Sequence, residues 1–152
     1  MLNKKILGIL CCVPLLIASC QGGTLQYTFH SFSDETWSRA DTVVIPFDSL
    51  HAGDYALDVC LRIGNDYEYR SLWMVVETVC SGSKTAQRDT LEIALADEDG
   101  DLLGGGLNIK QVTQECPPIH IGRHTDGTLR LFHIMRKRDV AGIHDIGIKI
   151  SR

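Results

Sequence analysis

Three carboxylates that alternate along the chain have the residue type and spacing of a cation-binding loop. Asp97, Asp99 and Asp101 are separated by single residues, and carboxylate oxygens are the ligands that Ca²⁺ prefers. An EF-hand loop starting at Asp97 needs glycine at its sixth position and glutamate at its twelfth. The chain has Leu102 and Asn108 there. We therefore expect a solvated turn, with a calcium loop of another type as the alternative.

Histidines are the second group with possible chemistry. His120 and His124 stand four residues apart, and His133 follows. A spacing of four brings two side chains together on a helix, and Gly122 and the Pro117–Pro118 pair disfavour a helix here. We expect exposed loop histidines rather than a zinc site, and we predict no metal and no cofactor.

Nucleophilic catalysis has little support in the sequence. Cys60 is expected in the middle of a strand, where a buried thiol is inert. The Gly104–Gly106 run lacks a following Lys-Ser/Thr pair, so permissive backbone explains it better than phosphate binding. His144 and Asp145 would point to opposite faces of a strand. We predict no catalytic residue and no enzymatic activity.

Cys20 carries the strongest chemical signal. A cationic start and an apolar run at 6–17, too short to span a bilayer comfortably, lead to the small residues Ala18 and Ser19. This order resembles the lipobox of bacterial lipoproteins, in which the cysteine thiol takes a diacylglycerol and its amine a further acyl chain. We predict lipidation of Cys20; the alternative is an ordinary cleaved signal with a chance cysteine.

The predicted domains are a lipoprotein signal peptide over 1–19, a lipidated tether over 20–24 and one domain over 25–152. Cleavage removes two of the 15 basic side chains and none of the 19 acidic ones, leaving a net charge of −6 with histidine neutral. An acidic domain without a basic block argues against nucleic acid as a partner. Membrane attachment is then expected through the acyl chains at Cys20.

Alternation of apolar and polar residues with a period of two predicts strands along most of the chain. Pro46 indicates an edge strand or a strand end, and 72–79, apolar on both faces, indicates a central strand. Asp139–Ile143 is a candidate for one short helical turn. We expect an all-β fold, a single antiparallel β-sandwich of about seven to eight strands. The clearest predicted strands cover 25–29, 42–47, 55–63, 72–79, 91–95, 129–135 and 146–150.

Three cysteines remain after Cys20. Cys60, Cys80 and Cys116 are an odd number, so at most one bridge can form. A turn at 64–66 is expected to close a hairpin that places Cys60 opposite a residue near Trp73 rather than opposite Cys80. We favour three free thiols, and the sequence leaves one disulfide open.

In four segments the chain resembles the GldH family of gliding-motility lipoproteins from Bacteroidetes. The segments are Trp37 with Asp41-Thr42, then 65–72, then 89–97 leading through Gly100 to 104–107, and Met135-Arg136 with 141–148. The resemblance implies an envelope lipoprotein connected with gliding and its associated secretion machinery. It implies no known enzymatic reaction, so there are no catalytic residues to carry over.

Four residues are candidates for a partner or ligand surface: Trp37, Tyr67, Tyr69 and Arg70. Aromatic side chains and arginine are favoured at recognition surfaces; the alternative is that the aromatic residues cover an open end of the sandwich. Trp73 is expected in the core. The basic cluster 136–138 could touch anionic headgroups or an acidic partner, and we favour a solvated loop.

The sequence thus favours a non-enzymatic lipoprotein that acts as a component or scaffold of a gliding- or secretion-associated complex. We expect it at the outer membrane facing the periplasm, with other envelope proteins as partners and no small-molecule substrate. The alternative is a glycan-binding sandwich with Trp37, Tyr67 and Tyr69 stacked on sugar rings. A hydrolase, which needs carboxylates or a His–carboxylate pair converging in a cleft, comes third.

Overall fold

The computed structural model describes residues 23–152, so the predicted signal segment 1–19 and Cys20 lie outside the described residues. Within this range the chain forms ten strands and no helix, which confirms the all-β prediction with more strands than expected. No described helix has the length and apolar character needed to cross a bilayer. The strands are β1 (Thr24–Ser31), β2 (Thr36–Ser38), β3 (Val43–Leu50), β4 (Gly53–Gly64), β5 (Ser71–Cys80), β6 (Gln87–Ala94), β7 (Ile109–Ile121), β8 (Thr125–His133), β9 (Asp139–Ala141) and β10 (Ile143–Ser151).

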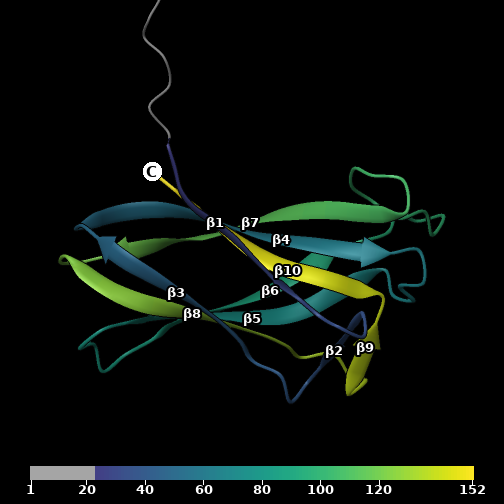
Figure 1. Cartoon of the computed structure of the whole chain (residues 1–152), viewed down its shortest axis with the longest axis horizontal. Helices are drawn as coiled ribbons and strands as arrows, with labels where there is room; N and C mark the ends of the chain where they lie inside the picture. The colour runs from purple at the N-terminus through teal and green to yellow at the C-terminus, as the bar shows by residue number, and fades with distance from the viewer. Residues whose placement is uncertain (1–22) are drawn as a thin grey trace, which may run out of the picture.

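The strands form a sandwich of two four-stranded antiparallel sheets and one small ribbon. The first sheet has the order β1-β10-β4-β7, the second has β3-β8-β5-β6, and β2 pairs with β9. Figure 1 shows β7 and β4 at the top and β8 and β5 below them. Pro46 lies in β3 at the edge of the second sheet, and β5 lies inside that sheet, as predicted.

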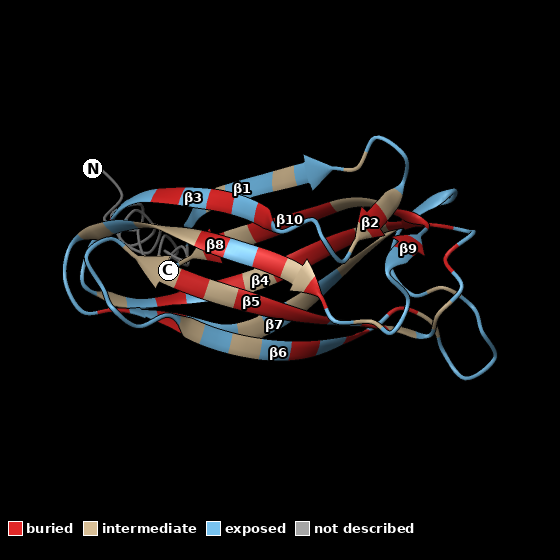
Figure 2. Ribbon diagram, turned by 90° about the horizontal axis from the view of Figure 1, so that it is seen from below, coloured by how far each residue is buried: buried red, intermediate tan, exposed pale blue. Residues whose placement is uncertain are grey.

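The core lies between the two sheets and follows from the period-two pattern. Ile146, Ile148 and Ile150 of β10 are fully buried, and Leu72 and Met74 of β5 are buried on the facing sheet. Figure 2 shows the pattern as alternating buried and exposed bands along β3 and β8. Each such side chain contributes about 1.5–3 kcal/mol on burial, so the inner faces hold the two layers together.

The predicted hairpin between 55–63 and 72–79 is wrong. The turn at Asn65 and Asp66 exists, but β4 pairs with β10 and β7, whereas β5 pairs with β6 and β8. The chain therefore crosses from the first sheet to the second through residues 65–70. Both strands carry apolar inner faces. Packing β4 and β5 face to face across the core buries these inner faces against each other, whereas pairing the two strands side by side in one sheet would not bring the faces into contact.

Two further expectations are corrected. Residues 139–143 form no helical turn, because β9 pairs with β2 and places the buried Val140 opposite the buried Trp37. The apolar residues of β1 do not face the core: Leu25 and Tyr27 are exposed. Instead Gln26 donates a hydrogen bond of 2.9 Å to the carbonyl of Pro46 in β3, which links the edges of the two sheets.

We predict that Gly127→Ala in β8 lowers the free energy of unfolding by about 1–3 kcal/mol, because overpacking forces neighbouring groups apart. A Cβ atom at Gly127 would meet the Phe47 ring and lie 2.5 Å from the Val79 carbonyl oxygen. Chemical denaturation measures the loss. Gly122→Ala, near the β7–β8 turn and with open space around its Cβ, is the control, and equal stability of the two variants would contradict the prediction.

Candidate partner surface

The crossing between the sheets positions the two predicted tyrosines. Tyr67 is buried, and its hydroxyl donates a hydrogen bond of 3.0 Å to the Ser71 carbonyl. Burial raises the pKa of Tyr67 above its ordinary value, and the charge of the neighbouring Tyr69 adds a smaller increase. Gly142, at φ +80°, allows close approach, since a Cβ there would lie 2.7 Å from the Tyr67 backbone nitrogen. Tyr67 is therefore a structural residue that closes this end of the sandwich.

Trp37 is also a core residue. Its side chain is fully buried, and its indole N–H donates a hydrogen bond of 2.9 Å to the Asp41 carbonyl. The indole stacks on Phe32 at 5.5 Å between ring centroids and meets the His133 ring edge-on at 5.4 Å. Trp37 and Tyr67 are thus unavailable for stacking on sugar rings, which removes two of the three residues on which the glycan alternative depended.

Tyr69 and Arg70 remain accessible. The Tyr69 ring is half-buried and meets Tyr67 edge-on at 5.8 Å, while the Arg70 side chain is exposed. The Arg70 carbonyl accepts hydrogen bonds from the backbone N–H groups of Leu95 and Ala96 at 2.8 and 3.0 Å. Of the four predicted surface residues, these two alone present side chains to solvent.

Trp73 does not belong to the core, contrary to the prediction. It lies on the outer face of the second sheet and is 42% exposed, beside Ile134, which is 45% exposed. Ile134 continues the pairing with β5 beyond the end of β8, because its N–H donates a hydrogen bond of 2.8 Å to the Trp73 carbonyl. The Trp73 N–H meets the weakly accepting Met135 sulfur at 3.3 Å. The chain thus turns away from the sheet at this point.

Two shallow hollows flank Ile134 where the chain turns away. The larger, of about 510 Å³, is lined by Arg39, Phe132, His133, Ile134 and Arg136. The other, of about 440 Å³, is lined by Tyr69, Trp73, Ile134, Met135, Arg136 and Lys137. Because Ile134 and Arg136 line both, we treat the two hollows together as the Trp73 groove.

The rim of the Trp73 groove is cationic. The Arg39 guanidinium donates to the Met135 carbonyl, and among residues 23–152 neither Arg39 nor Arg136 forms an ion pair. Lys137 pairs with Glu68 at 3.3 Å, and this hydrogen bond and charge raise the pKa of Lys137. No carboxylate lines either hollow. The groove therefore combines an apolar floor with net positive charge.

His133 lies beneath the groove in the core and not in an exposed loop. It is fully buried, and neither ring nitrogen has a hydrogen-bond partner among the described residues. Burial, followed by the Arg39 charge, lowers the pKa of His133, which outweighs weaker opposing contributions. The imidazole is therefore neutral at pH 7, and its protonation would place an uncompensated charge in the core.

Two histidines of the described chain contact carboxylates, His120 with Asp54 and His144 with Glu35 at 3.4 Å, and neither contact includes a cysteine. Cys60, Cys80 and Cys116 are free, as favoured. Burial raises the pKa of Cys80, and that of Cys116 to about 12, so both remain thiols. His120 meets Asp54 at 2.6 Å, but both side chains are more than 70% exposed. Residues 23–152 contain no group of three His, Cys, Asp or Glu placed to hold a metal ion.

The acidic loop adopts the expected turn. The Asp97 carboxylate accepts backbone N–H groups from Asp99 and Asp101 at 3.0 and 2.9 Å. Gly104 and Gly106 have positive φ, and a Cβ at either position would meet backbone of β7. Permissive backbone thus explains the glycine run, as predicted.

A sequence signal for the groove existed in the alternation of β5. Leu72, Met74 and Val76 face the core, and Glu77 on the opposite phase shares its face with Trp73 and Val75. A carboxylate at an odd position indicates the solvent side of the strand. Trp73 could therefore have been assigned to the surface.

Two comparisons with known proteins, one with family models and one with a curated relative, agree on one family. The model of the GldH lipoprotein family matches residues 25–150. A protein named gliding motility lipoprotein GldH from Flavobacterium johnsoniae is 30% identical over 101 residues, which are 66% of this chain and 62% of that protein. Dimeric latent PorU from Porphyromonas gingivalis is 10% identical with a TM-score of 0.36, over 88% of this chain and 13% of that one, and supports no argument.

We predict that acid destabilises the protein through His133. Since the folded pKa lies below the unfolded value of about 6.5, stability is complete above pH 7 and is lost as the pH falls through that value, by up to about 1.4 kcal/mol per unit. His133→Leu should flatten this dependence in denaturation curves from pH 8 to pH 5. The matched variant at an exposed histidine, His124→Leu, should keep it. Parallel curves for the two variants would contradict the assignment.

Proposed function

The chain belongs to the GldH lipoprotein family, and on this premise we propose that it is a lipid-anchored, non-enzymatic scaffold of a gliding- or secretion-associated envelope complex. The observation that carries the proposal is the family match over nearly the whole domain, residues 25–150. The family is one of cell-envelope lipoproteins and is not a known enzyme family. The connection with gliding comes from the name of the Flavobacterium relative.

The domain organisation belongs to this proposal. Residues 1–19 are removed as a signal, Cys20 carries the acyl chains, and 20–24 connect them to the sandwich. β1 begins at Thr24, the last residue of the tether. The short connection holds the first sheet close to the bilayer, at the outer membrane and on its periplasmic side.

A protein-binding role is favoured over the glycan alternative by the burial of two of its three aromatic residues. Trp37 and Tyr67 are 0% and 6% exposed, so they offer no platform for a sugar ring. What the second sheet presents instead is the Trp73 groove, with arginine, tryptophan and methionine, residue types enriched at protein interfaces.

We predict that Cys20→Ser abolishes incorporation of a labelled fatty acid, because the thiol that accepts the lipid is gone. A second variant, in which a signal without cysteine is cleaved before Gln21, should move the protein from the membrane to the soluble fraction. Loss of two or three acyl chains removes about 0.8 kcal/mol per buried CH₂. Cys116→Ser is the control and should retain label and membrane association. Persistent labelling or unchanged fractionation of the cysteine-free protein would refute anchoring.

We also predict that the wild-type lipoprotein, crosslinked in its native membrane and purified, carries other envelope proteins with it. A scaffold holds its partners in one complex. In cells that lack the lipoprotein, fewer of these partners should therefore be recovered together. Mass spectrometry of the purified material measures this. Recovery of the lipoprotein alone, under conditions that capture other envelope complexes, would count against a scaffold role.

A further inference from the structure

We propose that the Trp73 groove binds an acidic segment of a partner protein that inserts an aromatic or long aliphatic side chain into the hollow lined by Trp73 and Ile134. This inference rests on the proposed function, because it assigns the surface through which the scaffold holds a partner. Three observations on residues 23–152 support it: the two hollows, their apolar lining, and cations at the rim that form no ion pair.

The floor of the groove suits an apolar side chain. Trp73 and Ile134 are about half exposed although they lie on a sheet face, and Tyr69 and Met135 complete the smaller hollow. Its volume of about 440 Å³ falls within the range of ligand-binding clefts. Removing these side chains from water is favourable in proportion to the apolar area that becomes buried. An inserted hydrophobic side chain would supply that burial.

The charge of the rim selects an anionic partner. Arg39 and Arg136, which form no ion pair among residues 23–152, line the hollows together with Lys137, whose charge is already paired with Glu68. No carboxylate lines either hollow, although acidic side chains outnumber basic ones in the chain, 19 to 15. Glu92, the cross-strand neighbour of Trp73, lines neither hollow. Complementary charge sets partner specificity and the rate of encounter.

Elsewhere on the same sheet face the cations already have partners. Glu77 pairs with Arg88 at 3.5 Å and with Arg130 at 3.2 Å, and Arg88 also lies 5.4 Å from the centre of the Phe132 ring. Those two guanidinium groups share one carboxylate, so their charge is compensated in part within the chain. By contrast Arg136 is exposed, and no ion pair holds it within residues 23–152. Its charge is therefore available to a partner.

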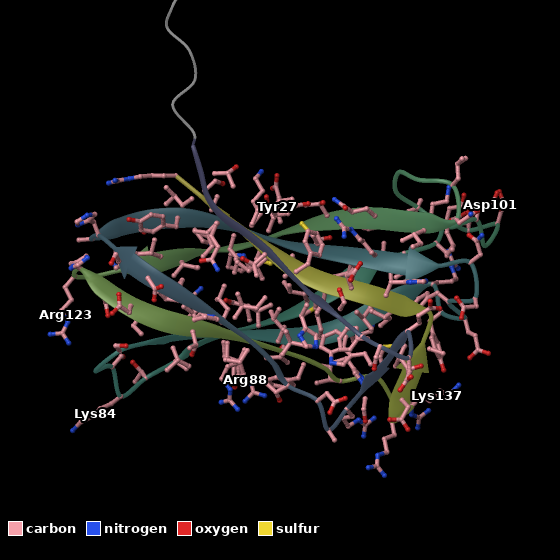
Figure 3. The ribbon with its side chains drawn as sticks, in the orientation of Figure 1. Tyr27, Lys84, Arg88, Asp101, Arg123 and Lys137 are labelled. Atoms are coloured by element: carbon pink, nitrogen blue, oxygen red, sulfur yellow. The ribbon has the colours of Figure 1, made fainter. Side chains whose placement is uncertain are left out.

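The position of the groove favours a protein over a lipid surface. β1 begins in the first sheet, and the N–H of Arg152 lies 3.4 Å from the Gly23 carbonyl, so both ends of the described chain meet there. In Figure 3 Lys137 lies at the lower right, diagonally across the molecule from the start of β1 at the upper left. An anchor preceding β1 would thus leave the groove facing away from the bilayer to which it attaches.

The test uses the full-length lipoprotein in its native envelope with the photoreactive residue benzoylphenylalanine at position 134. We expect a protein adduct, and mass spectrometry should map it to a partner peptide rich in Asp or Glu. The matched control places the photoreactive residue at Val44, which is 54% exposed on the same sheet and lines neither hollow. It should give little of this adduct.

Charge reversal then tests the role of the rim. Arg136→Glu should reduce the adduct about tenfold, since attraction becomes repulsion, whereas Arg136→Lys should retain most of it. Lys84→Glu makes the same charge change at the opposite end of the molecule (Figure 3) and should leave the adduct unchanged. Replacing a carboxylate of the mapped peptide by lysine should restore crosslinking to the Arg136→Glu protein.

Several results would overturn the proposal: no adduct at position 134, an adduct only to phospholipid or to a second copy of this chain, or a yield indifferent to Arg136→Glu. Fatty-acid labelling and co-purification with envelope proteins are read in the same cells. If both persist while the adduct fails these tests, the groove assignment is wrong and the scaffold proposal stands. If co-purification fails for the wild-type chain, the scaffold proposal itself is wrong.

Discussion

Burial of the inner faces of the two sheets against one another is the interaction on which the rest of the structure depends. The apolar alternation of β10 and β4 places isoleucine, leucine and valine on one side of the core, and β5 and β8 do the same on the other. Face-to-face packing forces the 65–70 segment to cross between sheets. That crossing buries Tyr67, brings Tyr69 beside it and sets the end of the sandwich where the Trp73 groove forms.

Much of this fold was predictable because period-two alternation is a local property of the sequence. Pro46 indicated an edge strand or a strand end, of which the edge position is correct, and the apolar run 72–79 indicated an interior strand. β7 was not expected, because it is an edge strand with mixed burial and contains two prolines. The partner of β4 was not predictable either. Strand pairing depends on which faces meet across the core, and adjacent apolar runs also suit a hairpin.

The surface was harder to predict than the core for a related reason. Trp37 stands in a polar stretch that suggests a loop, yet pairing of β2 with β9 draws it inward onto His133 and Phe32. Trp73 stands in a strand that is apolar on both faces, and only the phase of Glu77 distinguishes its sides. Aromatic residues therefore cannot be assigned to core or surface by type alone; the phase of each strand decides.

The two outer faces of the sandwich differ in how completely their polar groups are satisfied. On the first sheet, Arg62 lies 4.0 Å from the centre of the Phe29 ring and pairs with Asp145, while Lys149 pairs with Asp58. Gln111 connects this cluster to Tyr27 at 3.1 Å. On the second sheet, by contrast, the Trp73 end combines exposed apolar side chains with Arg39 and Arg136, which form no ion pair within residues 23–152. Exposed apolar area beside cations without an ion pair favours association, because a partner can bury the apolar side chains and supply the opposite charge.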